Sequence, residues 1–161
     1  YTDGLTGITN RRKFMEVFEI EVARARRTGS SIALLMCDVD HFKQVNDIRG
    51  HQAGDDAIMY LRDMLMDFTR PADVIARLGG DEFAMWLDDI LPDVAEARAS
   101  DLIKASKSME QFSGTPENPL GISVGVAVYK PDQNESLDEF ISWGIPNIRK
   151  FGEFFKNFQD F

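Results

Sequence analysis

The sequence has few cysteines and histidines, the residues that form disulfides and bind soft metal ions, and it lacks long apolar runs. It has one cysteine and two histidines in 161 residues. The single cysteine, Cys37, cannot form an internal disulfide and lies in an apolar run, which fits a reducing compartment. That run, Ile32 to Cys37, is the longest in the chain and far shorter than the roughly 20 residues of a membrane-spanning helix. We therefore expect a cytoplasmic domain that makes no membrane contact, although a parent protein could still be anchored elsewhere.

Positive charge is also scarce. Lys and Arg number 18 against 27 Asp and Glu, which gives a net charge of −9. Nucleic acids and anionic membranes attract basic surfaces, so this balance argues against a nonspecific binder of either. A ligand that carries phosphates would need local help from backbone amides, a few well-placed cations or a metal ion.

What the chain does contain is the composition of a globular domain. Hydrophobic residues make up 43% and charged residues 28%, values that are close to the globular average. The length suits one core. Because the sequence begins at Tyr1 without a methionine, we expect residues 1–161 to form a single domain taken from a longer protein.

Apolar periodicity and turn residues divide the chain into helices and strands. Two short apolar runs around Gly79 and Gly80 are typical of a β-hairpin. The expected order is helix 10–28, strand 31–38, helices 41–48 and 53–68, strands 74–78 and 82–87, helix 92–111, strand 121–129 and helix 137–161. This order predicts an α/β (α+β) fold with a mixed central sheet flanked by helices.

Two acidic clusters are candidates for a metal site. Asp38 and Asp40 follow a buried strand, and alternate residues of a strand share a face. Asp81 and Glu82 directly follow the two glycines of the predicted hairpin. Hard cations prefer oxygen ligands, so convergence of the two clusters would suit a divalent ion beside a phosphate. The alternatives are a helix cap for the first cluster and an ordinary turn for the second.

The segment Arg77-Leu78-Gly79-Gly80-Asp81-Glu82-Phe83 resembles the signature of the GGDEF family, the bacterial diguanylate cyclases. Other segments are similar to the remaining motifs of that family, in the same order. They are Asp3-Gly4-Leu5-Thr6-Gly7 with Asn10-Arg11-Arg12, Asp38-Val39-Asp40-His41-Phe42-Lys43 with Asn46-Asp47, Gly50-His51 with Gly54-Asp55, and Ser123-Val124-Gly125-Val126-Ala127.

The resemblance implies a nucleotidyl-cyclase or polymerase-palm fold with a ferredoxin-like core. Two such domains, each loaded with GTP, would face each other as a homodimer and make cyclic di-GMP, a bacterial signalling molecule, with release of two pyrophosphates. It also implies that Mg²⁺ or Mn²⁺ is held by Asp38, Asp81 and the Val39 carbonyl. Glu82 would contribute to the metal site or help to activate the 3′-hydroxyl.

The resemblance also implies a set of substrate-binding residues. Asn46 and Asp55 would read the guanine edge, since an amide and a carboxylate together match its donors and acceptor. The backbone amides of His41 and Phe42 would hold phosphates at a helix start, with Lys43 nearby. Gly79 and Gly80 would let the phosphates approach the backbone.

Several neighbouring residues have simpler interpretations. We expect Asp40 and Asp47 to be capping or network residues, and His51 to be a hydrogen-bonded structural histidine. Phe42 and Phe83 are expected to be core anchors. Arg11 and Arg12 are expected to hold the opening turn.

A regulatory site is also predicted. Arg70-Pro71-Ala72-Asp73 stands at the spacing of the family's inhibitory Arg-x-x-Asp motif. Arginine can grip phosphate or guanine with two hydrogen bonds, and aspartate can accept from guanine. Arg98 is a candidate for a second contact. The alternative is a surface salt bridge at a turn.

The C-terminal segment departs from the family's Lys-x-x-Gly-Arg-Asn-like ending. No register around Gly152 restores both cations, and Pro146 disturbs the predicted helix. We therefore keep three hypotheses: an active diguanylate cyclase with product inhibition, a catalytically weak or silent module that binds GTP or cyclic di-GMP and regulates an attached domain, and a pure dimerisation domain.

Overall fold

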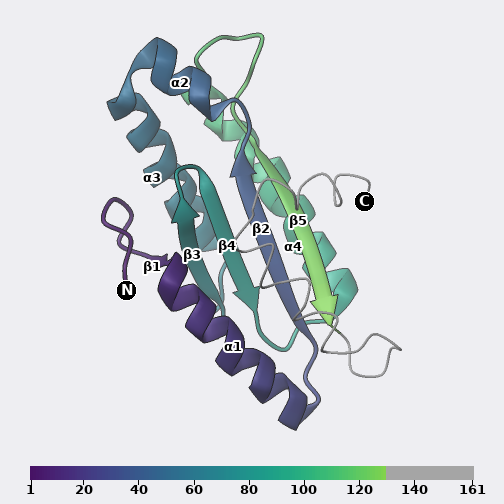
Figure 1. Cartoon of the computed structure of the whole chain (residues 1–161). Coiled ribbons are helices and arrows are strands. Elements are labelled where there is room, and N and C mark those ends of the chain that lie inside the picture. The colour runs from purple at the N-terminus through teal and green to yellow at the C-terminus, as the bar shows by residue number, and fades with distance from the viewer. Residues whose placement is uncertain (130–161) are drawn as a thin grey trace.

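The computed structural model describes residues 1–129. The predicted helix at 137–161 and the altered ending around Gly152 lie outside the described residues. The centre of the fold is a five-stranded sheet in the order β1-β3-β4-β2-β5, shown in Figure 1. Its strands are β1 (Thr9–Asn10), β2 (Ile32–Val39), β3 (Val74–Gly79), β4 (Glu82–Leu87) and β5 (Ile122–Tyr129).

Strand direction makes the sheet mixed, as predicted. β1 runs parallel to β3, while the β3–β4, β2–β4 and β2–β5 pairs are antiparallel. The helices are α1 (Arg11–Thr28), α2 (Phe42–Arg49), α3 (His51–Asp67) and α4 (Pro92–Ala105), followed by the 3₁₀ helix η1 (Ser106–Phe112). Within residues 1–129, no helix combines the length and the apolar composition needed to cross a lipid bilayer.

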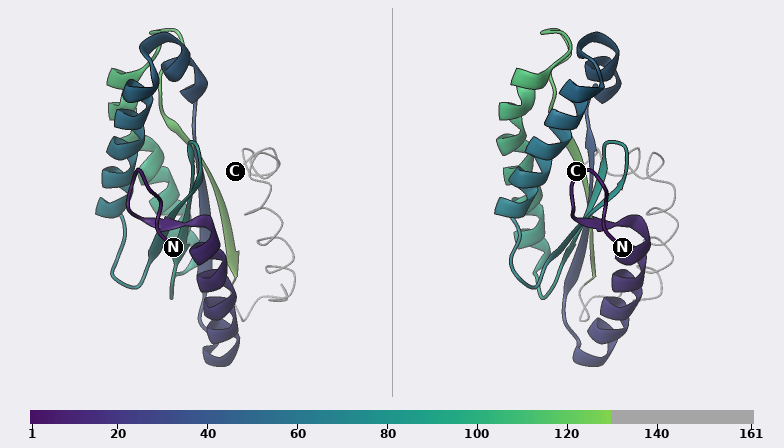
Figure 2. Two further views of the ribbon diagram at one scale, coloured as in Figure 1. Left: turned by 60° about the vertical axis from the view of Figure 1, so that its left-hand side comes forward. Right: turned by 90° about the vertical axis from the view of Figure 1, so that its left-hand side faces the viewer.

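The helices cover the two faces of the sheet unequally. Figure 2 shows α1 on one face, with α3 and α4 on the other. The core on the α3 and α4 side contains Leu35, Phe83 and Ile58, and the core on the α1 side contains Phe14, Phe18 and Trp86. The sheet is therefore the middle layer between two apolar cores.

Strand β2 is the central strand, as its continuous apolar run predicts. Ala33, Leu35, Cys37 and Val39 face the core beneath α3 and α4, whereas Ile32, Leu34 and Met36 face the core beneath α1. A strand buried on both faces shows no polar alternation because neither face meets water. The same parity puts Asp38, the next residue in the second series, on the α1 face.

The predicted hairpin is present. β3 and β4 are joined through Gly80 and Asp81, and Gly80 has a φ of 39°, a conformation that glycine adopts without a Cβ penalty. Figure 1 shows this turn at the same end of the sheet as the C-terminal end of β2. The two acidic segments predicted to converge therefore lie at one end of the fold.

Two elements differ from the prediction. The helix expected over 92–111 ends at Ala105 and continues as η1. The Ser106 and Ser108 hydroxyls donate to the carbonyls of Ile103 and Ala105, and such local hydrogen bonds compete with regular helix geometry. The short strand β1 was not predicted, because two residues carry no periodic signal.

Helix α1 packs against the sheet through Phe18. Phe18 is fully buried and meets Trp86 edge to face, with ring centroids 5.5 Å apart. Replacing Phe18 by Ala should lower the free energy of unfolding by about 3–5 kcal/mol, because it removes buried surface and leaves a cavity. Urea unfolding followed by circular dichroism measures this loss.

Ile20 on the same helix provides the matched control, because 62% of it is exposed. Ile20→Ala should change stability by less than about 0.5 kcal/mol. Equal losses in the two variants would contradict the packing of α1 through its Phe18 face.

Candidate functional site

Strand register brings the first acidic residue next to the hairpin. Asp38 lies opposite Glu82 on β4 and opposite Ser123 on β5. The Asp38 carboxyl also lies close enough to Asp81 for a hydrogen bond between them. Asp38, Asp81 and Glu82, which sequence analysis selected from two distant segments, thus meet at one end of the sheet.

The carboxylates in this cluster repel one another. The pKa of Asp38 rises from its ordinary value of 3.8 to about 8, because of partial burial, the hydrogen bond with Asp81 and the nearby charges of Asp81, Glu82 and Asp40. Partial burial also raises the pKa of Glu82, which the Arg11 guanidinium opposes and Asp81 reinforces. The ionised cluster therefore has too little positive charge around it.

This donor set fits a divalent cation. Hard cations take carboxylate and carbonyl oxygens, and the Asp38 and Asp81 carboxylates lie together beside the Val39 backbone. Within residues 1–129 no cluster of three or more His, Cys, Asp or Glu side chains is arranged to hold a metal ion. Two carboxylates and one carbonyl would leave coordination positions for substrate and water, as is usual for Mg²⁺.

The turn after β2 is held by Asp40. Its backbone N–H donates to the Gly121 carbonyl at 2.9 Å, and its carboxylate accepts a 2.6 Å hydrogen bond from the Ser123 hydroxyl. Asp40 is therefore a network residue, as predicted. Ser123 had been recognised only as part of the late strand motif, because its pairing with Asp40 spans 83 positions.

Helix α2 starts directly after this turn. His41 adopts a left-handed conformation with a φ of 61°, which is uncommon for a residue other than glycine. It precedes Phe42, the first residue of α2, whose N-terminal amides are free of intrahelical partners. Phe42 packs partly against the core and Phe83 is fully buried, so both anchor it as expected, while Lys43 is exposed.

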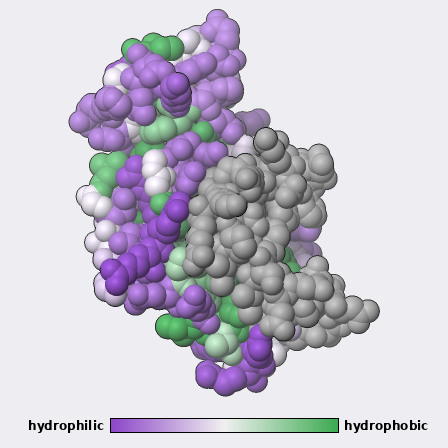
Figure 3. Space-filling view, viewed as in Figure 1, coloured by the Kyte–Doolittle hydropathy of each residue, from purple (hydrophilic) through white to green (hydrophobic). Residues whose placement is uncertain are grey.

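The two predicted guanine-reading residues lie on adjacent helices. Asn46 is on α2 and Asp55 on α3, both half-buried, and the helices meet at Gly50, where φ is 90°. Figure 3 shows mainly hydrophilic residues over this upper end of the molecule. His51 and Asp47 are exposed here, and the predicted structural hydrogen bond of the His51 side chain is not found among residues 1–129.

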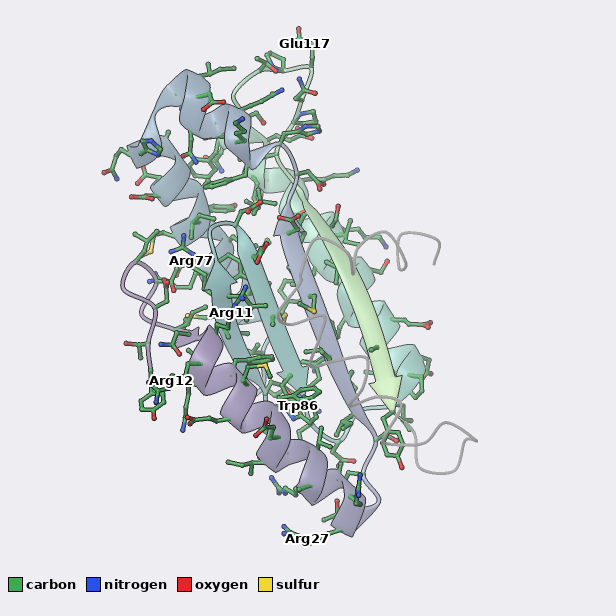
Figure 4. All side chains as sticks on the ribbon, viewed as in Figure 1. Arg11, Arg12, Arg27, Arg77, Trp86 and Glu117 are labelled. Atoms are coloured by element: carbon green, nitrogen blue, oxygen red, sulfur yellow. The ribbon has the colours of Figure 1, made fainter. Side chains whose placement is uncertain are left out.

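The prediction that Arg11 and Arg12 hold the opening turn is confirmed only for Arg12. Arg77 pairs with Asp3 at 3.2 Å and donates to the Gly80 carbonyl, and Arg62 on α3 donates to the Thr6 carbonyl at 3.0 Å, so both hold the opening turn. Arg11 donates to a β3 carbonyl and lies 3.6 Å from Glu82, reaching from α1 over the sheet in Figure 4. Arg12 lies over the ring of Tyr1, so it contacts the opening segment as predicted. Sequence spacing could not reveal the contacts of Arg77 with Asp3 and of Arg62 with Thr6, which span 74 and 56 positions.

The Arg-x-x-Asp segment forms an internal network. Arg70 pairs with Asp73 at 2.8 Å, and Arg98 on α4 lies 3.2 Å from the other carboxylate oxygen. The Arg70 and Asp88 backbone N–H groups donate to the same carboxylate. The Asp73 side chain is completely buried, whereas Arg70 remains 38% exposed. Arg98 is thus committed to Asp73, and the guanidinium of Arg70 is the part that a ligand can reach.

This network makes stability depend on pH. Burial opposes ionisation of Asp73, but hydrogen bonds from Arg70 and the Arg70 charge outweigh it and lower its pKa below 3.8. Stabilisation by the ionised carboxylate is therefore complete above the unfolded pKa of about 3.9 and is lost as pH falls through the folded value. Asp73→Asn should cost about 1–3 kcal/mol at pH 7, with the difference from wild type shrinking below about pH 4.

Urea unfolding of both proteins between pH 7 and pH 3 measures this difference. Asp101→Asn, at an exposed position on α4, is the control and should track the wild type throughout. A difference between Asp73→Asn and wild type that stays constant down to pH 3 would show that ionisation of Asp73 is not its source.

Comparison with known proteins places the chain in a family. A family model described as "Diguanylate cyclase, GGDEF domain" matches residues 1–144. A probable diguanylate cyclase of Escherichia coli K12, DgcC, is 37% identical over 134 residues, covering 82% of this chain and 35% of DgcC. The cyclic di-GMP phosphodiesterase NbdA of Pseudomonas aeruginosa is 33% identical over 139 residues, covering 86% of this chain and 18% of NbdA.

A solved structure agrees with these matches. The GGDEF domain of DgcB from Caulobacter crescentus, in complex with c-di-GMP, superposes with a TM-score of 0.76 at 29% identity, covering 94% of this chain and 90% of that one. The chain spans about a third or less of the length of the two curated relatives. The match of the family model over most of the sequence shows that the chain belongs to the GGDEF family.

Proposed function

We propose that this chain is the catalytic domain of a diguanylate cyclase, which condenses two GTP molecules into cyclic di-GMP and two pyrophosphates. The observation that carries the proposal is the meeting of Asp38, Asp81 and Glu82 at one end of the sheet. Carboxylates crowded in this way are suited to a divalent cation and a polyphosphate. The relatives named diguanylate cyclases support the same activity.

Asp38, Asp81 and the Val39 carbonyl would hold Mg²⁺ or Mn²⁺. When bound, the ion would polarise the α-phosphate and favour ionisation of the attacking 3′-hydroxyl. The contribution of the chain is to keep the two carboxyl groups together; partial burial and their crowding raise the pKa of Asp38 to about 8, so a bound cation would favour its ionised form. Glu82 adds a third acidic group, which Arg11 orients from 3.6 Å.

The rest of the substrate would be held around α2. Backbone amides at His41 and Phe42 can donate to phosphate oxygens at the positive end of the helix, with Lys43 as an exposed cation. The Asp55 carboxylate would accept hydrogen bonds from the N–H groups of guanine, and the Asn46 carboxamide would donate to its carbonyl oxygen. At the hairpin, Gly79 and Gly80 are exposed and have no atom within 4 Å of where a Cβ would stand, so a phosphate can approach their backbone.

Synthesis requires two copies of the domain. The product contains two symmetric phosphodiester bonds, and the site described holds one set of guanine-reading residues and one carboxylate cluster. A twofold homodimer with the sites facing each other would supply both 3′-hydroxyls. The net charge of −9 makes such an approach depend on specific contacts and bound cations.

We further propose that cyclic di-GMP inhibits the enzyme by binding at Arg70 and Asp73. The exposed guanidinium of Arg70 would grip the ligand, and the buried carboxylate of Asp73 would position that guanidinium. In this arrangement Asp73 is committed to Arg70 and Arg98 and would accept from guanine only after Arg70 moves. The c-di-GMP complex of the DgcB domain supports a ligand of this class.

A regulatory role is the second candidate. One relative is named a cyclic di-GMP phosphodiesterase, and the ending around Gly152 lacks one of the two cations of the family motif. A domain that binds GTP or cyclic di-GMP without turnover could control a neighbouring domain. The pure dimerisation hypothesis leaves the carboxylate cluster without a role.

An assay of cyclic di-GMP synthesis distinguishes the cyclase from the regulatory module. The chain fused to a coiled coil that enforces a dimer, incubated with GTP and Mg²⁺, should yield cyclic di-GMP detectable by chromatography. Asp81→Asn should reduce the rate on the order of 100-fold or more, because it removes one of the paired carboxylates. Asp93→Asn, exposed on α4, should retain the rate. GTP binding with no product would favour the regulatory module.

The inhibitory site is tested by binding. Arg70→Ala should weaken cyclic di-GMP affinity by about 10- to 100-fold in calorimetric titration, since charge-assisted hydrogen bonds of about 1.5–3 kcal/mol are lost. Lys104→Ala, which removes an exposed cation at the end of α4, is the matched control and should bind normally. Unchanged affinity in Arg70→Ala would remove this residue from the product site.

A further inference from the structure

Gly54 is a buried glycine in the first turns of α3. Its backbone is helical, with no positive φ that would favour glycine. Alanine in a helix interior is favoured over glycine by about 1 kcal/mol. Local structure therefore gives no reason for glycine here, and the reason must lie in what surrounds the residue.

The surroundings are side chains of α2. A Cβ built on Gly54 would collide with Oδ1 of Asn46, and it would stand 3.0 Å from Cγ of Asn46 and 3.4 Å from Cζ of Phe42. The Asn46 carboxamide thus lies directly against the Cα of Gly54. The nearest atom is the end of a side chain rather than backbone, so a methyl group would displace the carboxamide and leave the helix in place.

The backbone between the two helices produces this contact. The Gly50 N–H donates to the Asn46 carbonyl at 3.1 Å, which ends α2, and the Gly54 N–H donates to the Gly50 carbonyl at 3.3 Å as α3 begins. Gly50 itself has a φ of 90°, which turns the chain sharply. The two hydrogen bonds bring Gly54 back against Asn46 and put Asp55 next to the contact.

We infer that Gly54 is a specificity-determining position, because the absence of a side chain there keeps the Asn46 carboxamide beside Asp55 in the arrangement that reads guanine. The inference rests on the proposed function of Asn46 and Asp55. Gly54 itself touches no substrate and acts only through Asn46. It is therefore a positioning residue.

Gly54→Ala tests this inference directly. The added methyl group should turn the Asn46 carboxamide away and weaken GTP binding by about tenfold, the loss expected for one hydrogen bond to the base. ATP binding should change little, so the preference for GTP over ATP should fall by the same factor. Calorimetric titration of both nucleotides with Mg²⁺ gives this ratio, and thermal unfolding should show no loss of stability, because alanine favours the helix.

A double-mutant cycle tests whether Gly54 affects GTP binding through Asn46. Asn46→Ala removes both the hydrogen bond and the obstacle to a methyl group at position 54. If Gly54 acts through Asn46, the double variant Asn46→Ala/Gly54→Ala should bind GTP no more weakly than Asn46→Ala alone. Additive losses of about 100-fold in the double variant would overturn the inference, as would normal GTP preference in Gly54→Ala.

A readout without nucleotide separates this inference from the proposed function. The side-chain amide signals of Asn46, identified by their disappearance from the NMR spectrum of Asn46→Ala, should move in Gly54→Ala. Gly4→Ala is the control, since nothing lies within 4 Å of a Cβ at Gly4, and it should leave these signals and GTP affinity unchanged. Unmoved amide signals would overturn the positioning role. Moved signals in a chain that binds no GTP would instead overturn the proposed function.

Discussion

The position of β2 between β4 and β5 is the constraint on which the site depends. One register aligns Asp38 with Glu82 on one side and with Ser123 on the other. Because side chains alternate along a strand, a shift of one residue would bury Asp38 in a core and expose an apolar neighbour. The apolar residues of β2 therefore fix the place of its terminal carboxylate, and the two cores stabilise the repelling acids.

The two ends of the sheet differ in how their acidic residues are paired with basic ones. At the end formed by Asp38 and the hairpin, acids outnumber their basic partners, and the pKa of Asp38 rises to about 8. At the other end, the buried Asp73 is enclosed by Arg70 and Arg98, and its pKa falls. The acids of the first group lack enough neighbouring basic side chains, whereas the acid of the second group is neutralised by two arginines of the same fold.

Much of the architecture follows from patterns of near neighbours. The hairpin was predicted from Gly79 and Gly80 between apolar runs, and β2 from six consecutive apolar residues bounded by turns and acids. The predicted C-terminal boundary of α4 was wrong, because hydrogen bonds from two serine hydroxyls favour the 3₁₀ helix η1 over further α-helix. The structural role of His51 was not supported, and Arg77 and Arg62 hold the opening turn without having been predicted to do so. These errors concern contacts between distant or locally ambiguous groups, which periodicity does not encode.

The sequence by itself determined the composition of the site: the acids after β2 and in the hairpin, the amide and carboxylate on α2 and α3, and a family resemblance that the comparisons confirmed. Tertiary structure alone decided which of these groups touch. It joined Asp40 to Ser123, enclosed Asp73 between two arginines, and placed the Asn46 carboxamide on a glycine. The physical reason is that hydrogen bonds and steric contacts act over a few ångströms in space, whatever the separation along the chain.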